Sequence, residues 1–78
     1  MMKQDRGIKE LDLRHLLCPM PVIRTQNALK KMAQGERLKI YCTDPGVRHD
    51  IPAWCKLHGY AILESQEKAN TFIFLIEA

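Results

Sequence analysis

The chain has 78 residues, of which 46% are hydrophobic and 27% charged, and its formal net charge is +3 at pH 7. This length predicts one domain over residues 1–78, with residues 1–7 as a flexible arm. No apolar run approaches the roughly 20 residues that span a bilayer, and residues 1–9 lack the apolar stretch of a signal peptide. These features exclude a membrane protein and lead us to expect a cytoplasmic one. The mild positive charge indicates a solvated surface, and we expect no direct binding of nucleic acid.

The first two predicted elements are a strand and a helix. Residues 8–14 alternate between apolar and polar side chains after the first, with Leu11 and Leu13 on one side, which is the period of a half-buried strand. Apolar residues then recur at helical spacing over residues 19–33. Gly35 follows as a stop signal.

A second strand and helix follow. Residues 37–43 alternate again and predict a strand. The next apolar residues follow a helical face that Gly59 can cap. Because Pro52 must sit in the first turn of this helix, we expect regular helix from residue 49 or 50, after a shaped loop over residues 44–49.

The chain ends with two predicted strands over residues 60–66 and 71–77, joined by a hairpin turn. The order β-α-β-α-β-β favours an α/β (α+β) two-layer sandwich, with a four-stranded mixed sheet and two helices on one face. The last strand is apolar on both faces. If both helices lie on one side, either Ile73 and Leu75 or their neighbours point outward, as a partner surface or as a tolerated outer face.

The sequence Cys-Pro-Met-Pro begins at Cys18, between the first strand and the first helix. Proline is favoured at the first helical position, so we interpret Pro19 as that residue and Cys18 as the N-cap, with Pro19 and Pro21 fixing where the sulfur points. Unpaired N–H groups and the helix dipole would favour a thiolate there. Cysteine is a poor N-cap, so we prefer a nucleophilic thiol to an inert buried one.

The other thiols and histidines suggest packing and loop roles. Cys42 and Cys55 fall on inward faces and are expected in the core. His15 and Cys18 form an H-x-x-C pair, but a structural zinc site usually needs four ligands in paired spacings, and neither His49 nor the remaining histidine completes one. We therefore expect no metal and no cofactor.

Asp44, Arg48 and Asp50 cluster at the entrance of the second helix. Capping and turn formation explain the two aspartates, and all three are candidate partner-binding residues. If the two helix N-termini lie side by side, Arg48 could meet the thiolate or a partner carboxylate.

On the residues alone, three classes of function stay open. One is a thiol transferase that acts through Cys18. Another is a redox enzyme that pairs Cys18 with Cys55, although the absence of CxxC spacing argues against it. The third is a non-catalytic regulatory module that binds RNA or protein through a basic surface, formed by Lys30, Lys31, Arg37 and Lys39.

From about residue 8 to its end, the chain resembles the TusA family of small sulfur carriers. Cys-Pro-Met-Pro matches the family's CPxP motif. The other matching segments are Leu11-Asp12, Gly35-Glu36, Asp44-Pro45, Asp50-Ile51-Pro52, Trp54-Cys55 and Gly59. The sequence departs from many relatives at Tyr60 and His49, which bears on partner contacts.

The resemblance implies the same β-α-β-α-β-β sandwich and a sulfurtransferase activity in which Cys18 carries sulfur as a persulfide. A cysteine desulfurase would be the sulfur donor, and a downstream acceptor protein would pass the sulfur toward tRNA 2-thiouridine synthesis. Other branches of the family supply molybdenum cofactor formation or sulfur oxidation. We expect a monomer.

Overall fold

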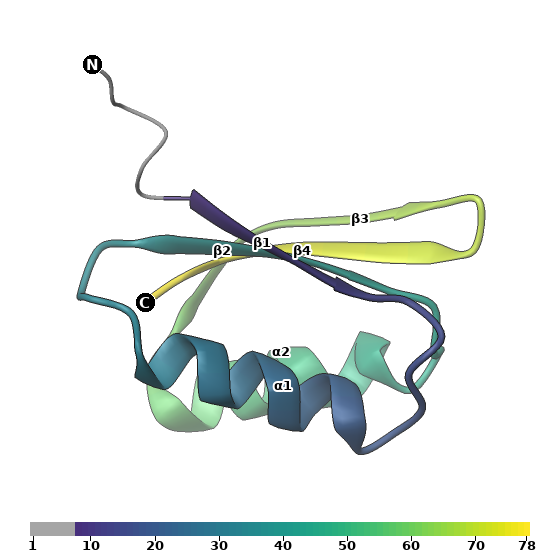
Figure 1. Ribbon diagram of the computed structural model, residues 1–78, viewed down its shortest axis with the longest axis horizontal. Helices are drawn as coiled ribbons and strands as arrows, with labels where there is room; N and C mark the ends of the chain where they lie inside the picture. The colour runs from purple at the N-terminus through teal and green to yellow at the C-terminus, as the bar shows by residue number, and fades with distance from the viewer. Residues whose placement is uncertain (1–7) are drawn as a thin grey trace.

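The computed structural model of the protein describes residues 8–78. The elements follow the order β1 (Ile8–Leu13), α1 (Met20–Lys30), β2 (Arg37–Cys42), α2 (Val47–His58), β3 (Ala61–Lys68) and β4 (Thr71–Glu77). The four strands form one sheet, and both helices cover the same face of it (Figure 1). The predicted two-layer fold is therefore confirmed. The predicted arm over residues 1–7 lies outside the described residues.

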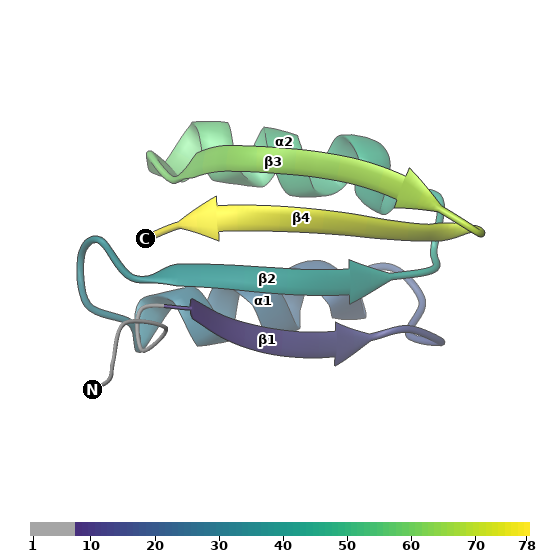
Figure 2. The same ribbon diagram turned by 90° about the horizontal axis from the view of Figure 1, so that it is seen from above.

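The sheet has the strand order β1-β2-β4-β3 (Figure 2). β1 and β2 are parallel, whereas β4 is antiparallel to both β2 and β3. Each helix carries the chain back from the end of one strand to the start of the next, so α1 and α2 begin at the same end of the sheet, where β1 and β2 finish. The loops over residues 14–19 and 43–46 meet at this end.

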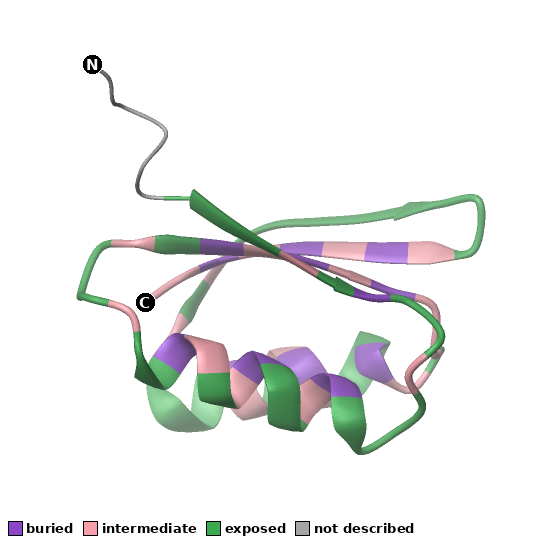
Figure 3. Ribbon diagram, in the orientation of Figure 1, coloured by how far each residue is buried: buried purple, intermediate pink, exposed green. Residues whose placement is uncertain are grey.

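The core lies between the sheet and the helices, whose facing sides are the buried ones (Figure 3). Alternate residues of β2 are buried, as its sequence pattern predicted, and alternate residues of β4 are buried although that strand is apolar on both faces. Complete burial of one such aliphatic side chain is worth about 1.5–3 kcal/mol. The largest of the completely buried aliphatic side chains are Leu29, Leu38, Ile40, Val47, Ile51 and Ile76.

The helices differ from the prediction at their ends. α1 ends at Lys30, three residues before the predicted end at residue 33. Gly35 does not cap it: with φ +92° it shapes the turn before β2, and its N–H donates to the carbonyl of Ala78 at 2.8 Å.

α2 begins at Val47, earlier than the predicted start at residue 49 or 50. The carbonyl of Asp44 accepts a hydrogen bond from the Val47 N–H at 3.1 Å, which closes a tight turn ahead of the helix. Pro52 consequently lies inside the helix, not in its first turn, and removes one backbone donor there. Gly59 caps the helix as predicted, with φ +81° in the left-handed region.

The hairpin and the last strand follow the sequence pattern closely. β4 has the predicted bounds, and β3 extends two residues beyond its predicted end to Lys68. Ala69 and Asn70 form the turn with φ +49° and +65°. Of the two alternatives, Ile73 and Leu75 are the residues that point to the outer face of the sheet, and both are partly exposed. Whether they form a partner surface remains a prediction.

Candidate functional site

Hydrogen bonds join two loops at the end of the sheet where β1 and β2 finish. The backbone N–H of His15 donates to Thr43 Oγ1 at 2.9 Å, and that of Cys18 donates to Asp44 Oδ2, also at 2.9 Å. These bonds join the loop before α1 to the loop before α2. Cys18 is therefore held beside the entrance of the second helix.

Cys18 occupies a tight turn that closes just before α1. The carbonyl of Leu17 accepts a hydrogen bond from the Met20 N–H at 2.8 Å, and the Cys18–Pro19 peptide bond is cis, which defines a type VI turn. Pro19 is the residue before the helix, and Pro21 is its second residue. The prediction that Cys18 caps the helix and Pro19 begins it was wrong by one position.

The helix start offers few free donors to the sulfur. The Met20 N–H is already bonded to Leu17, Pro21 has no N–H, and the Ile23 N–H donates to the carbonyl of Pro19 at 3.1 Å. No side chain forms a capping hydrogen bond at this end of α1. The helix N-terminus therefore stabilises a thiolate less than the sequence pattern led us to expect.

The sulfur instead meets a carboxylate from the second helix. Cys18 Sγ donates a hydrogen bond to Asp50 Oδ2 at 3.4 Å. Asp44 Oδ2 and Asp50 Oδ2 lie 3.5 and 3.6 Å from the position where a Cβ would stand on Gly46. These same two oxygens face Cys18. Asp44 Oδ2 accepts a hydrogen bond from the Cys18 backbone N–H, and Asp50 Oδ2 accepts one from the Cys18 side chain.

This contact sets the acid–base behaviour of the exposed thiol. The hydrogen bond to Asp50 raises the pKa of Cys18, and desolvation and the negative charges of Asp50 and Asp44 raise it further. The predicted lowering of this pKa was therefore wrong in sign. A helix N-terminus acts on a thiol only when its donors are free and face the sulfur.

The other two cysteines belong to the core, as predicted. Cys42 on β2 is 0% exposed and Cys55 on α2 is 1% exposed, whereas Cys18 is exposed. Burial raises the pKa of each core thiol to about 11. Among the three, Cys18 is the thiol that a protein partner can reach.

Arg48 does not join Cys18. It is exposed and lies on another side of α2, where it lines a pocket of about 230 Å³ together with Pro52, Ser65, Gln66, Glu67, Phe72 and Phe74. Asp50 is two positions further along the helix, so it points in a different direction. The predicted meeting of Arg48 with the thiolate was wrong, and its role in partner binding stays a prediction.

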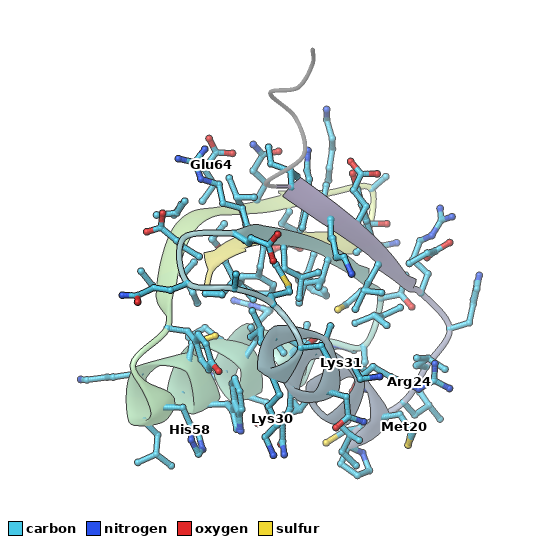
Figure 4. All side chains as sticks on the ribbon, turned by 60° about the vertical axis from the view of Figure 1, so that its left-hand side comes forward. Met20, Arg24, Lys30, Lys31, His58 and Glu64 are labelled. Carbon is cyan, nitrogen blue, oxygen red and sulfur yellow. The ribbon has the colours of Figure 1, made fainter. Side chains whose placement is uncertain are left out.

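Exposed apolar side chains surround the turn that carries Cys18, and the sequence interpretation missed them. Leu17 is 72% exposed, Met20 36% and Ile23 39%. Met20 and Arg24 project outward from the first turns of α1 (Figure 4). The available signal was that Ile23 falls outside the apolar stripe of the helix and that Leu17 precedes the helix.

Residues 8–78 contain no group of three or more histidine, cysteine, aspartate or glutamate side chains arranged to hold a metal ion. His15 is an exposed loop residue, in agreement with the prediction, and its backbone adopts φ +73°. Within the same residues, no helix is long and apolar enough to cross a membrane.

Comparisons with known proteins show which family shares this sequence and fold. The family model described as sulfurtransferase TusA matches residues 9–78. YrkI from Bacillus subtilis strain 168 is 37% identical over 76 residues, which cover 97% of each chain. The sulfur carrier protein TusA of Pseudomonas aeruginosa PAO1 is 41% identical over 66 residues, which cover 85% of this chain and 84% of that protein.

A solved structure extends the likeness to three dimensions. The crystal structure of a SirA-like protein from Desulfitobacterium hafniense superimposes with a TM-score of 0.81 at 26% identity, covering 91% of this chain and 96% of the other. Sequence and fold thus agree over almost the entire chain. The chain belongs to the TusA family of sulfurtransferases, which are sulfur carrier proteins.

Proposed function

We propose that the protein carries sulfur as a persulfide on Cys18, that a cysteine desulfurase loads it, and that it passes the sulfur to an acceptor protein on the route to tRNA 2-thiouridine. The observation that carries this proposal is the exposure of Cys18 in its Cys-Pro-Met-Pro turn, while the other two thiols are buried. Pro19 and Pro21 flank Met20 and position this turn.

The transfer needs only a nucleophilic thiol and a docked donor. Cys18 Sγ attacks the outer sulfur of the donor's cysteine persulfide and forms a new S–S bond. The S–S bond of the donor breaks, and its electron pair leaves with the donor's cysteine sulfur. The proton that Cys18 loses ends on that leaving sulfur. One sulfur atom moves, and neither an oxidant nor a reductant is consumed.

Mass spectrometry of the intact protein tests this function. We expect incubation with a cysteine desulfurase and cysteine to add the mass of one sulfur atom, removable by a thiol reductant. Cys18→Ser should abolish the gain. Cys55→Ala is the matched control and should retain it, because this cysteine is 1% exposed. A gain that persists in Cys18→Ser would refute the assignment of Cys18.

The redox alternative requires Cys18 to pair with another thiol of the chain. Cys42 and Cys55 are buried in the core, so either would have to leave it to form a disulfide with Cys18. A Cys18–Cys55 disulfide after mild oxidation would support that alternative. We favour the carrier because it uses the exposed thiol alone.

The alternative of RNA or protein binding through a basic surface has less support. Lys39 Nζ lies 5.8 Å from the ring centroid of Tyr41, and Arg37 lies 4.0 Å from a carboxylate oxygen of Glu77. Two of the four basic residues are therefore engaged by their own chain. Charge reversal at Lys30 and Lys31 should leave sulfur loading of Cys18 intact.

A further inference from the structure

Cys18 is a nucleophile placed against two negative charges. Its side chain donates to Asp50 at 3.4 Å and its backbone donates to Asp44 at 2.9 Å. Among residues 8–78, the ion pairs within 4.0 Å join Arg14 to Asp12 and Arg37 to Glu77. Neither carboxylate beside the thiol therefore has a cation from the described part of the chain.

This arrangement opposes the chemistry that loading demands. A thiolate is the reactive form of cysteine, and a neighbouring carboxylate disfavours it by repulsion. The hydrogen bond to Asp50 exists only while the sulfur keeps its proton. In the free protein the exposed thiol is thus held in its less reactive form.

Resting on the proposed carrier function, we propose that Asp50 keeps Cys18 latent in the free protein, and that the sulfur donor activates it by placing a basic side chain against Asp50 and Asp44. Asp50 is then a positioning residue that controls the proton of Cys18. The partner that fits this site carries a lysine or arginine beside its own persulfide.

The donor is the first partner that needs this device, because it meets Cys18 while the thiol still holds its proton. During loading, Cys18 Sγ is the attacking atom and must lose its proton. During unloading, the acceptor's thiolate attacks the outer sulfur of the persulfide, and Cys18 Sγ is the leaving group. The exposed apolar side chains of Leu17, Met20 and Ile23 beside the turn provide contact area for the donor around the charged pair.

Alkylation of the free protein tests the latent state. Asp50→Asn keeps the shape of the side chain and removes its charge. We expect the pKa of Cys18 to fall and its reaction with iodoacetamide at pH 7 to accelerate, by about threefold for each pKa unit, because a tenfold gain in thiolate is partly offset by lower nucleophilicity. Glu64→Gln is the matched control, since it removes one carboxylate from β3, away from Met20 and the start of α1 (Figure 4).

Loading by a cysteine desulfurase tests the partner's role on the same variants. We expect Asp50→Asn to be loaded more slowly than the unmodified chain, because the donor's cation has lost its counter-charge, while Glu64→Gln is loaded normally. A general base or a merely structural residue would not give opposite changes in the two rates. Asp50→Asn that alkylates no faster than the unmodified chain, or that is loaded as fast, overturns the proposal.

Two further outcomes can be distinguished from a failure of the proposed role of Asp50. If the desulfurase fails to load even the unmodified chain, the carrier function is wrong, while the alkylation rates still report whether Asp50 suppresses the thiol. If Asp50→Asn does not fold, the unmodified chain supplies the test. Its Cys18 should then alkylate with a midpoint above the ordinary thiol value of 9.0, and a midpoint below this value overturns the latent state.

Discussion

Cys18 and the two core cysteines all have a raised pKa, but for different reasons. At Cys42 and Cys55 burial is the main cause, and at Cys18 it is a hydrogen bond to Asp50. Burial can be reversed only by opening the core. A contact with an exposed carboxylate can be reversed by a partner that brings a cation, with no change of fold. A pKa shift in the same direction is thus fixed by the fold at the core thiols and can be changed by a partner at Cys18.

The largest expected difference between the regions is in stability. Ile51 is 0% exposed and lies next to Asp50 in α2, so Ile51→Ala should lower the free energy of unfolding by about 2–5 kcal/mol through lost burial and a cavity. Cys18→Ala removes an exposed side chain and should change it by less than about 0.5 kcal/mol. Urea unfolding followed by circular dichroism measures both. Comparable losses in the two variants would contradict the separation of site and core.

The next largest expected effect is a loss of stability at alkaline pH, caused by the two core thiols. The folded-state pKa of Cys42 and of Cys55 is about 11, against an ordinary value of 9.0, so the folded chain retains protons that the unfolded chain releases. Stability is therefore fully present below about pH 9 and is lost as the pH rises toward about 11. Each thiol contributes on the order of 2 kcal/mol to this loss.

Urea unfolding at pH 8 and pH 10.5 measures that loss. Lysines and tyrosines also titrate in this range, so the decisive quantity is the difference between the unmodified chain and Cys55→Ala. The variant should lose less stability between the two pH values. Equal losses would show that the buried thiols do not drive the alkaline transition. Glu64→Gln, which removes an exposed carboxylate from β3, is the control and should lose as much as the unmodified chain.

The fold could be predicted from the sequence because its signals are local. Alternating side chains gave nearly correct bounds for β1 and β2, and a continuous apolar run gave the correct bounds for β4. Gly59 marked the end of α2 for the same reason, since a left-handed residue is a local requirement. The start of α2 was misplaced because the hydrogen bonds ahead of Val47 come from loop carbonyls, which leave no mark in the hydrophobic pattern.

The chemistry of Cys18 was harder to predict because its decisive contact is not local. Asp50 is 32 positions away in sequence, and both side chains had plausible local roles, one as a helix cap and the other in the first turn of α2. The helix dipole argument also counted donors that the turn at Leu17 and Met20 already uses. The cysteine was identified from its motif, whereas the direction of its pKa shift required the fold.

The smallest expected effects come from glycines at the two ends of α2. A Cβ added to Gly46 would lie 3.5 and 3.6 Å from carboxylate oxygens of Asp44 and Asp50, which are ordinary contacts, and with φ −61° this position can accept alanine. Gly46→Ala should raise the free energy of unfolding by about 0.4–1 kcal/mol, because it restricts the unfolded chain. Gly59 has φ +81°, so Gly59→Ala should lower it by about 1–2 kcal/mol.

The Gly46→Ala variant tests whether the loop that carries Cys18 is held beside α2 by hydrogen bonds or by close packing. If hydrogen bonds hold it, a methyl group beside Asp44 and Asp50 should leave the rate of Cys18 alkylation nearly unchanged while stability rises. Thermal unfolding and alkylation by iodoacetamide measure the two quantities on the same samples. A large change in alkylation rate in Gly46→Ala would mean that the carboxylates are packed as tightly as the core, and that a docking cation could not enter between them.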